Sequence, residues 1–328
     1  MMTQKELYAR CKDRVFDQIT LVTDNAFTQT ANLISIYQWT VSSMGIVSGK
    51  GKVDGKESYY TAYEICGFVG DIELRVVQPI TGDTSYKRYL DRFGAGLCCL
   101  REVVPQNRYG EELECYKSRG LILEQEEDGC AVFDLKSELG ILYAVVSECS
   151  PLRHKEPEQA DGRRICQINI TCKDIEAASR KLIELLDIGP YEIGHINPVT
   201  VTNLGIRVDG RLEQPEFEYL LGMNCCGNLE IELIAPVKGP NCFADYMARR
   251  PEGGFNHLKE VVPTGQWEQT LQHYADLGME QCIKGKIGPC GWCFMNTEKE
   301  LGFLVELGDG VPMTKLPDGY DPYFIPAE

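Results

Sequence analysis

The sequence predicts an α+β fold of two tandem halves, each made of paired βαβββ modules. The main observation is a stretch that occurs twice: residues 93–105 read FGAGLCCLREVVP and residues 251–263 read PEGGFNHLKEVVP, at a shift of 158. Shorter landmarks repeat in the same order, with VVQPITG matching LIAPVKG at a shift of 157 and two ELG triplets matching at a shift of 162. A length of 328 residues also suits two domains of roughly 150 residues each.

In the first half, apolar patterning predicts a strand at residues 16–23 and a helix at residues 27–44. The buried face of this helix is expected to hold Phe27, Ala31, Ile34 and Val41. Further strands are expected at residues 59–69, 71–77, 121–125, 130–135 and 141–147, with room for a short helix before Arg92. We therefore place the first domain at residues 1–148.

Residues 149–164 are polar, include two prolines and have little to bury, which predicts a linker. The second domain is expected at residues 165–310, followed by a C-terminal tail at 311–328. Asp174 can cap a helix in which Ile175, Ala178, Leu182 and Leu185 recur at helical spacing before Gly189-Pro190. The other predicted elements are strands at 165–172, 216–221, 229–234, 255–262, around 283, at 292–295 and at 303–307, and helices at 243–249 and 267–277.

Composition excludes several classes of partner. Asp and Glu outnumber Lys and Arg 49 to 33, and no compact basic run could follow a phosphate backbone, so nucleic acid and anionic membranes are excluded as partners. No apolar run reaches the roughly 18 residues of a membrane helix, and the charged start MMTQKELYARCKDR lacks a signal peptide. We expect a cytoplasmic protein with a small-molecule substrate, and leave a homodimer open.

The duplicated stretch differs between its copies in one chemically important residue. His257, one of four histidines, lies in the second copy, where the first copy has Cys99. A duplicated scaffold with an imidazole in one copy indicates that the second half carries the chemistry. A lone histidine in a strand is more often a structural histidine than a metal ligand, so His257 by itself does not establish a site.

Four segments carry a resemblance to a known family: ICQINITCKDIEAASRKL, LEIELIAPVKGP, GGFNHLKEVV and EKELGFLVELG. They resemble four strands of the vicinal oxygen chelate superfamily, which includes glyoxalase I, methylmalonyl-CoA epimerases, extradiol dioxygenases and 4-hydroxyphenylpyruvate dioxygenase. The resemblance implies tandem glyoxalase-like domains whose curved sheets enclose a cavity. It also implies that the first half is a degenerate copy.

The family's metal ligands map onto Gln167, Glu232, His257 and Glu306. One imidazole, two carboxylates and an amide oxygen suit a divalent ion such as Zn, Co, Ni or Mn better than Fe. The corresponding positions of the first half are Gln18, Arg75, Cys99 and Ala144. Because Arg75 would repel a cation, we expect no metal there. Glu230 and Glu232 share one strand face, so spacing alone leaves open which of them is a ligand.

The resemblance implies a metal-dependent isomerase, epimerase or lyase that removes a proton next to a carbonyl. Glu306 is the first choice as base and Glu232 the second; Glu218 resembles a catalytic glutamate of the epimerases. One alternative is a non-haem iron dioxygenase of the 4-hydroxyphenylpyruvate dioxygenase type, but Gln167 stands where one of its two histidines belongs. The other is a non-catalytic small-molecule binding protein, which would lack the four ligands.

Overall fold

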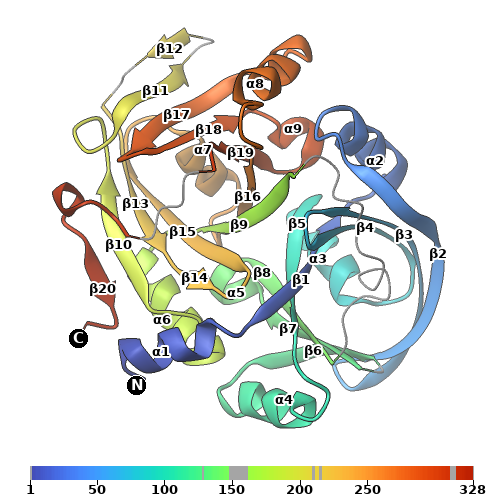
Figure 1. Ribbon diagram of the computed structural model, residues 1–328. Helices are drawn as coiled ribbons and strands as arrows, with labels where there is room; N and C mark the ends of the chain where they lie inside the picture. Colours follow the sequence, from blue (N-terminus) through green and yellow to red (C-terminus); the bar gives the residue numbers. More distant parts are fainter. Residues whose placement is uncertain are drawn as a thin grey trace. The chain divides into compact units, whose positions relative to one another are not determined.

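A computed structural model describes residues 2–127, 129–147, 162–208, 211–213, 216–310 and 315–327. The chain divides into two compact units (Figure 1). We call Arg14–Ala160 with Glu300–Gly302 the N-terminal unit, and Met1–Asp13, Asp161–Lys299 and Phe303–Glu328 the C-terminal unit. The predicted linker falls largely on residues 148–161, outside the described residues. No helix in the described part of the chain is long and apolar enough to cross a membrane.

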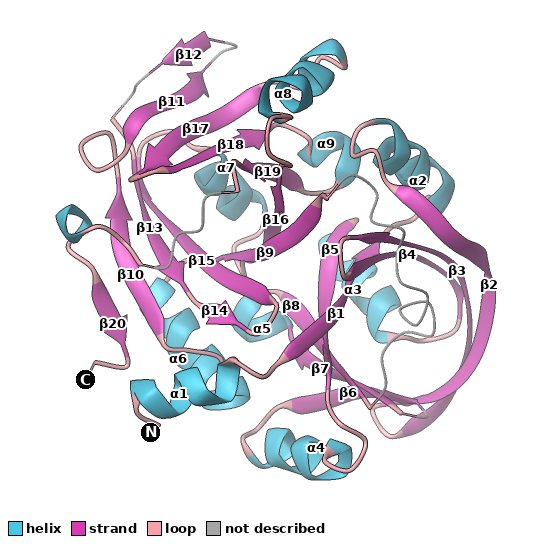
Figure 2. Cartoon of the chain, viewed as in Figure 1, coloured by secondary structure: helices cyan, strands magenta, loops and turns pink. Residues whose placement is uncertain are grey.

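The N-terminal unit is a closed barrel with strand order β1-β4-β3-β2-β6-β7-β8-β5 (Figure 2). Two βαβββ modules build it, because β1 runs parallel to β4 and β5 runs parallel to β8, while the strands between are antiparallel. Its elements are β1 (Val15–Val22), α2 (Ala26–Ser35), β2 (Thr40–Val53), β3 (Lys56–Val69), β4 (Ile72–Thr81), α3 (Ser85–Phe93), β5 (Gly96–Val103), α4 (Tyr109–Ser118), β6 (Ile122–Glu127), β7 (Cys130–Leu135), α5 (Lys136–Leu139) and β8 (Ile141–Val146).

The C-terminal unit is an open, curved sheet with strand order β12-β11-β17-β18-β19-β16-β9-β15-β13-β10-β20, in which β14 pairs with β15. Here β9 is parallel to β15 and β16 is parallel to β19, so the same two modules recur and the predicted α+β fold is confirmed. The remaining elements of the chain are α1 (Gln4–Cys11), β9 (Arg164–Thr171), α6 (Ile175–Leu186), β10 (Tyr191–Ile196), β11 (Thr202–Val208), β12 (Arg211–Glu213), β13 (Glu218–Met223), β14 (Cys225–Cys226), β15 (Leu229–Lys238), α7 (Cys242–Arg249), β16 (Gly254–Val261), α8 (Trp267–Asp276), β17 (Gln281–Ile287), β18 (Cys290–Met295), α9 (Glu298–Leu301), β19 (Leu304–Gly308), the 3₁₀ helix η2 (Asp318–Tyr320) and β20 (Tyr323–Ile325).

Both ends of the chain pack into the C-terminal unit. In α1 the thiol of Cys11 contacts the carbonyl oxygens of Asp187 and Gly189, at 3.5 and 3.2 Å, which explains why residues 1–13 group with the second half. At the other end β20 pairs with β10, and Leu316 and Tyr320 join the hydrophobic core. The segment that the sequence suggested as a tail therefore completes the sheet.

The predicted helix at residues 27–44 is wrong beyond Ser35. α2 ends there, Gln38 adopts a left-handed φ of 53°, and residues from Thr40 onward form β2. The predicted buried face is also displaced, since Phe27 is 64% exposed. β2 escaped detection because most of its side chains are exposed and no alternation is visible. The local signal was Asp54-Gly55, two positive-φ residues that suit the turn of a tight hairpin between β2 and β3.

The Asp174-capped helix is confirmed as α6. The carboxylate of Asp174 accepts a hydrogen bond from the Ala177 N–H at 3.0 Å, so the first turn is capped as expected. The helix ends at Leu186, where Asp187 takes the left-handed conformation, before the Gly189-Pro190 pair is reached.

Strand register makes the two halves comparable residue by residue. On β1, Gln18 lies opposite Glu73 of β4 and Arg101 of β5, and Arg101 lies opposite Ala144 of β8. On β9, Gln167 lies opposite Glu230 and Lys259, and Lys259 lies opposite Glu306. Each of these four positions therefore has a defined counterpart in the other half.

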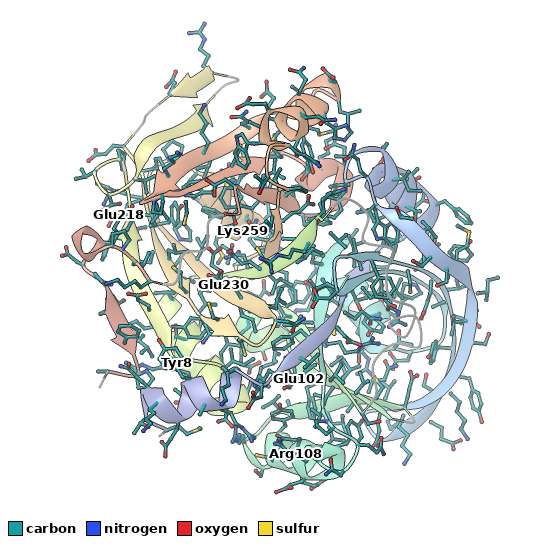
Figure 3. The ribbon with its side chains drawn as sticks, in the orientation of Figure 1. Tyr8, Glu102, Arg108, Glu218, Glu230 and Lys259 are labelled. Carbon is teal, nitrogen blue, oxygen red and sulfur yellow. The ribbon has the colours of Figure 1, made fainter. Side chains whose placement is uncertain are left out.

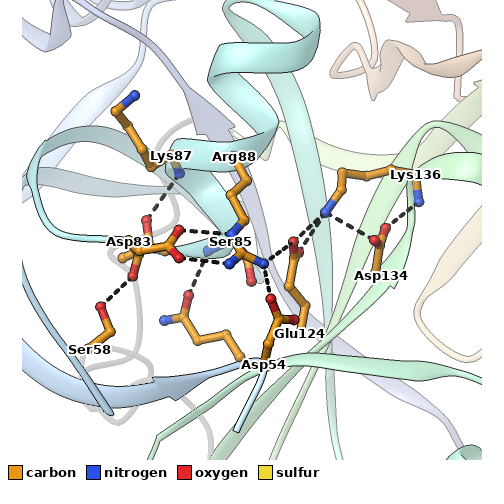
Figure 4. Close-up of polar contacts among 11 residues, drawn as sticks. Asp54, Ser58, Asp83, Ser85, Lys87, Arg88, Glu124, Asp134 and Lys136 are labelled. Carbon is orange, nitrogen blue, oxygen red and sulfur yellow. Dashed lines mark hydrogen bonds and ion pairs between the residues drawn. The ribbon is translucent and has the colours of Figure 1, made fainter. Parts of the chain in front are cut away.

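An ion network around one buried pair links α3, α5 and β6 in the N-terminal unit (Figure 4). Lys136 Nζ lies 2.6 Å from a Glu124 carboxylate oxygen, and both side chains are about 95% buried, at 6% and 5% exposure. Arg88 contacts Asp83 and Asp54, both at 2.7 Å, and approaches Glu124 at 3.4 Å. The network neutralises a carboxylate that the fold has removed from water.

Changing Lys136 to methionine is expected to lower the free energy of unfolding by about 3 kcal/mol, because it leaves the buried Glu124 carboxylate with the longer Arg88 contact alone among the ion pairs of the network. Lys87→Met is the matched control, since Lys87 forms an exposed pair with Asp91 one turn along α3 and should cost less than about 0.5 kcal/mol. Urea unfolding followed by circular dichroism measures both. Equal decreases in the free energy of unfolding of the two variants would show that the buried pair stabilises the protein no more than the exposed one.

Candidate metal centre

Three of the four predicted ligands meet in the C-terminal unit. His257 Nε2 lies 3.1 Å from Glu232 Oε2 and 3.2 Å from Glu306 Oε2. One ligand atom from each residue fits within 4.8 Å of the others, and all three residues are buried. This is the one group of its kind among the described residues, and its donor set is one that a divalent cation accepts.

Strand geometry brings these residues together. Glu232 is on β15, His257 on β16 and Glu306 on β19, so residues far apart in sequence reach one face of the sheet. β9 lies between β15 and β16, and β19 is hydrogen-bonded to β16. Side chains alternate between the two faces of a sheet along each strand. The position of a residue along its strand therefore fixes the face on which its side chain lies.

Neighbouring side chains orient the group. Asn169 Nδ2 donates to Glu232 Oε2 at 3.0 Å, and Asn169 Oδ1 accepts from the Thr171 hydroxyl at 2.8 Å. The ring of Phe294 packs edge-on against the imidazole of His257, with centroids 4.7 Å apart. The carboxylate and imidazole are therefore held by outer contacts, as ligand side chains in metal sites usually are.

Gln167, the fourth predicted ligand, is 1% exposed. It lies on β9, directly opposite Glu230 of β15 on one side and Lys259 of β16 on the other, and it lines the cavity described below. Its Nε2 has no hydrogen-bond partner in the described part of the chain, whereas His257 Nε2 lies beside the carboxylates of Glu232 and Glu306. Buried polar atoms are normally paired. An unpaired amide in this place fits a fourth ligand beside Glu232, His257 and Glu306.

A cavity of about 280 Å³ opens beside these residues. Strands β9, β13, β15, β16, β18 and β19 provide its walls, so the curved sheet encloses the space. Its lining combines charged and amide side chains with apolar ones, among them the aromatic rings of Tyr219, Trp292 and Phe294. This combination of apolar walls and a few polar groups is typical of small-molecule sites.

Four further charged residues line the cavity: Arg164, Glu230, Lys259 and Asp309. Glu230 and Lys259 are labelled in Figure 3, near the middle of the sheet. Burial raises the pKa of the Glu230 carboxyl to about 8, with Lys259 opposing the effect. Burial alone would lower the pKa of Lys259, but the nearby Glu306 carboxylate outweighs it and raises the pKa, so the amine stays protonated.

The two oxygens of Glu306 have different partners. Oε2 faces His257, whereas Oε1 lies 2.8 Å from Lys259 Nζ. Burial would raise the pKa of the Glu306 carboxyl, but Lys259 and His257 outweigh it and lower the pKa. For His257, burial favours the neutral ring, yet contacts with Glu232 and Glu306 raise its pKa. The site is thus a compact set of mutually compensating charges.

Glu218 does not join the site. It begins β13, opposite Lys238, and its carboxylate lies 2.5 Å from His195 Nδ1 on β10. Tyr219 and Leu221 of the same strand line the cavity, but Glu218 is not among the described residues that do, and Figure 3 shows it apart from Lys259 and Glu230. The sequence alignment with the epimerase glutamate crossed a loop, and strand pairing carries the residue away.

Sequence reasoning missed the roles of Lys259 and Asn169. Each lies two residues from a predicted ligand, His257 or Gln167, and so shares its strand face. Extending the alternation by one step along each ligand strand would have found both. The same step shows that Glu230 and Glu232 both face the cavity, with Glu232 the one that contacts His257.

The N-terminal unit has other chemistry at the equivalent positions. Arg75 forms an ion pair with Glu64 and lies over the ring of Tyr86, with its guanidinium carbon 5.3 Å from the ring centroid. Cys99 is buried, and burial raises the pKa of its thiol to about 12. A neutral thiol and a paired guanidinium are poor partners for a cation.

No family model matches the sequence, and no curated protein matches it in sequence. The fold is shared with a triple variant of 4-hydroxymandelate synthase from Streptomyces coelicolor, at 11% identity and a TM-score of 0.60, over 92% of this chain and 94% of that one. A variant of homoprotocatechuate 2,3-dioxygenase from B. fuscum is 13% identical with a TM-score of 0.52, over 94% of this chain and 75% of that one. Catechol 2,3-dioxygenase is 15% identical with a TM-score of 0.48, over 90% and 93%.

Identities this low show the fold alone. The chain has the tandem glyoxalase-like fold of the vicinal oxygen chelate proteins, and the resemblance found in the sequence is confirmed at that level.

Proposed function

We propose that this protein is a metal-dependent isomerase, epimerase or lyase that removes a proton next to a carbonyl group of a small molecule. The observation that carries the proposal is the buried group of Glu232, His257 and Glu306 beside a cavity. With Gln167 as fourth ligand, the set has one nitrogen and three oxygen donors, which suits Zn, Co, Ni or Mn. Such an ion stabilises negative charge that develops on a substrate oxygen as the proton leaves.

The other steps of the reaction are assigned to side chains of the site. Glu306 is our first choice as the base and Glu232 the second, because both are carboxylates at the cavity wall within reach of His257. Asn169 holds Glu232 in place through a hydrogen bond. The rings of Tyr219, Trp292 and Phe294 exclude water and contact the apolar part of the substrate.

A dioxygenase is the second candidate, favoured by the fold shared with homoprotocatechuate 2,3-dioxygenase over 94% of this chain. Non-haem iron oxygenases of the facial-triad type bind iron through two imidazoles and one carboxylate. The buried group of Glu232, His257 and Glu306 offers one imidazole. The donor set therefore supports proton transfer better than oxygen activation.

Oxygen dependence separates the two candidates. We expect turnover of a panel of 2-oxo acids, thiol adducts of 2-oxoaldehydes and acyl-CoA thioesters to persist without air, with Zn²⁺, Co²⁺, Ni²⁺ or Mn²⁺, since proton transfer needs no oxidant. Product analysis and an oxygen electrode give the measurement. Product that forms with Fe²⁺ alone and consumes oxygen stoichiometrically would establish the dioxygenase instead.

A further inference from the structure

We infer that the cavity takes a substrate with a negatively charged group and that Lys259 binds this group. The inference rests on the proposed function, since it assigns a substrate class to the same site. Lys259 lies two residues after His257 on β16, so both side chains leave one face of the strand. It lines the cavity, and Glu306 is its one ion-pair partner among the described residues.

The duplicated half provides an internal comparison. Arg101 is the counterpart of Lys259, because it lies opposite Gln18 and Ala144 as Lys259 lies opposite Gln167 and Glu306. Arg101 has a carboxylate of its own: its two nitrogens lie 2.8 and 2.9 Å from the oxygens of Asp17, which is 0% exposed.

The counterpart of Asp17 in the second half is Cys166. Both occupy a β-bulge, since the register skips Asp17 between Phe16 and Gln18 on β1 and skips Cys166 between Ile165 and Gln167 on β9. The C-terminal unit therefore retains the basic residue but replaces its dedicated counter-ion by a neutral thiol. That difference leaves Lys259 with Glu306, a residue that the proposed function assigns to a metal.

An ammonium group has three N–H donors, and Glu306 Oε1 accounts for one of them. Two other donors at the cavity lack partners within the described residues: Gln167 Nε2 and Trp292 Nε1, on side chains of residues that are 1% and 5% exposed. A buried ammonium group with further N–H donors close to it is an arrangement that binds a carboxylate or another small anion. A neutral substrate would leave them unused.

The cavity also limits the number of charges on the substrate. Glu230 lies on the far side of Gln167 from Lys259, two strand spacings or about 10 Å away along the sheet. A second anionic group in the cavity would also meet Asp309, another acidic residue of the lining. Because the rings of Tyr219, Trp292 and Phe294 also line the cavity, the structure favours a small monoanion with an apolar or aromatic body.

The test compares phenylglyoxylate with its neutral amide, which has the same ring and the same adjacent oxygens. Calorimetric titration of metal-loaded wild-type protein should give an affinity about 10- to 100-fold higher for the acid, as expected for hydrogen bonds to a charged group. Lys259→Met should remove this preference and retain binding of the amide, while Lys259→Arg should preserve it. Lys238→Met is the matched control, because it removes the same charge from an exposed position of the same unit.

Equal affinities for acid and amide in the wild type, or a preference that survives in Lys259→Met, would overturn the inference. Retained binding of the amide shows that the methionine variant is folded. Elemental analysis of the same samples distinguishes this result from failure of the proposed function. If the protein takes up no divalent ion, the proposed function is contradicted. The ratio of the affinities for phenylglyoxylate and its amide still decides whether Lys259 selects an anion.

Discussion

Glu306→Gln is expected to slow the exchange of a substrate C–H proton with deuterated water by about 10² to 10⁴, the usual contribution of a general base. The amide oxygen of glutamine can still face His257, but it cannot accept the proton. Exchange is followed by NMR with the best substrate of the panel, and elemental analysis shows how much metal the variant retains. The combination of retained metal and lost exchange identifies a base.

Glu230→Gln is the matched comparison for this experiment. Glu230 also lines the cavity, but the structure shows no ion pair between it and His257, whereas Glu306 lies 3.2 Å from His257 Nε2. A smaller loss is therefore expected. Undiminished exchange in Glu306→Gln would move the role of base to Glu232 or Glu230.

The chain is expected to bind one divalent ion, and His257→Ala to weaken its binding by more than about 100-fold. Changes in residues that merely orient ligands already cost about 10- to 100-fold, and His257 offers the one nitrogen donor of the group. Competition with a chromophoric chelator measures the affinity. Elemental analysis of chelator-treated and remetallated protein gives the stoichiometry.

Cys99→Ala is the control, because Cys99 occupies the position of His257 in the N-terminal unit. It should leave both affinity and stoichiometry unchanged. Two ions per chain that are lost together in His257→Ala would contradict the asymmetry between the halves. If the protein binds no divalent ion under any loading condition, the proposed metal-dependent function is contradicted.

Local features of the sequence were sufficient for the general fold. The shift of 158 between the two copies of the repeated stretch paired His257 with Cys99, and the strand registers place these residues at matching positions. The capped helix α6 was equally predictable, because its signals lie within one segment. β2 was not, because an exposed strand owes its conformation to its partner β3 and has little pattern of its own.

The sequence by itself determined that Gln167, Glu232, His257 and Glu306 lie on strands of one half, because the repeated segments and the apolar patterns of the strands can be recognised in the sequence. Tertiary structure decided which side chains meet. It brought Glu232 to His257, placed Lys259 beside Glu306, and left Glu218 with His195. Alternation assigns a side chain to a face of its strand, but its neighbours across the sheet depend on the register of strands that are distant in sequence.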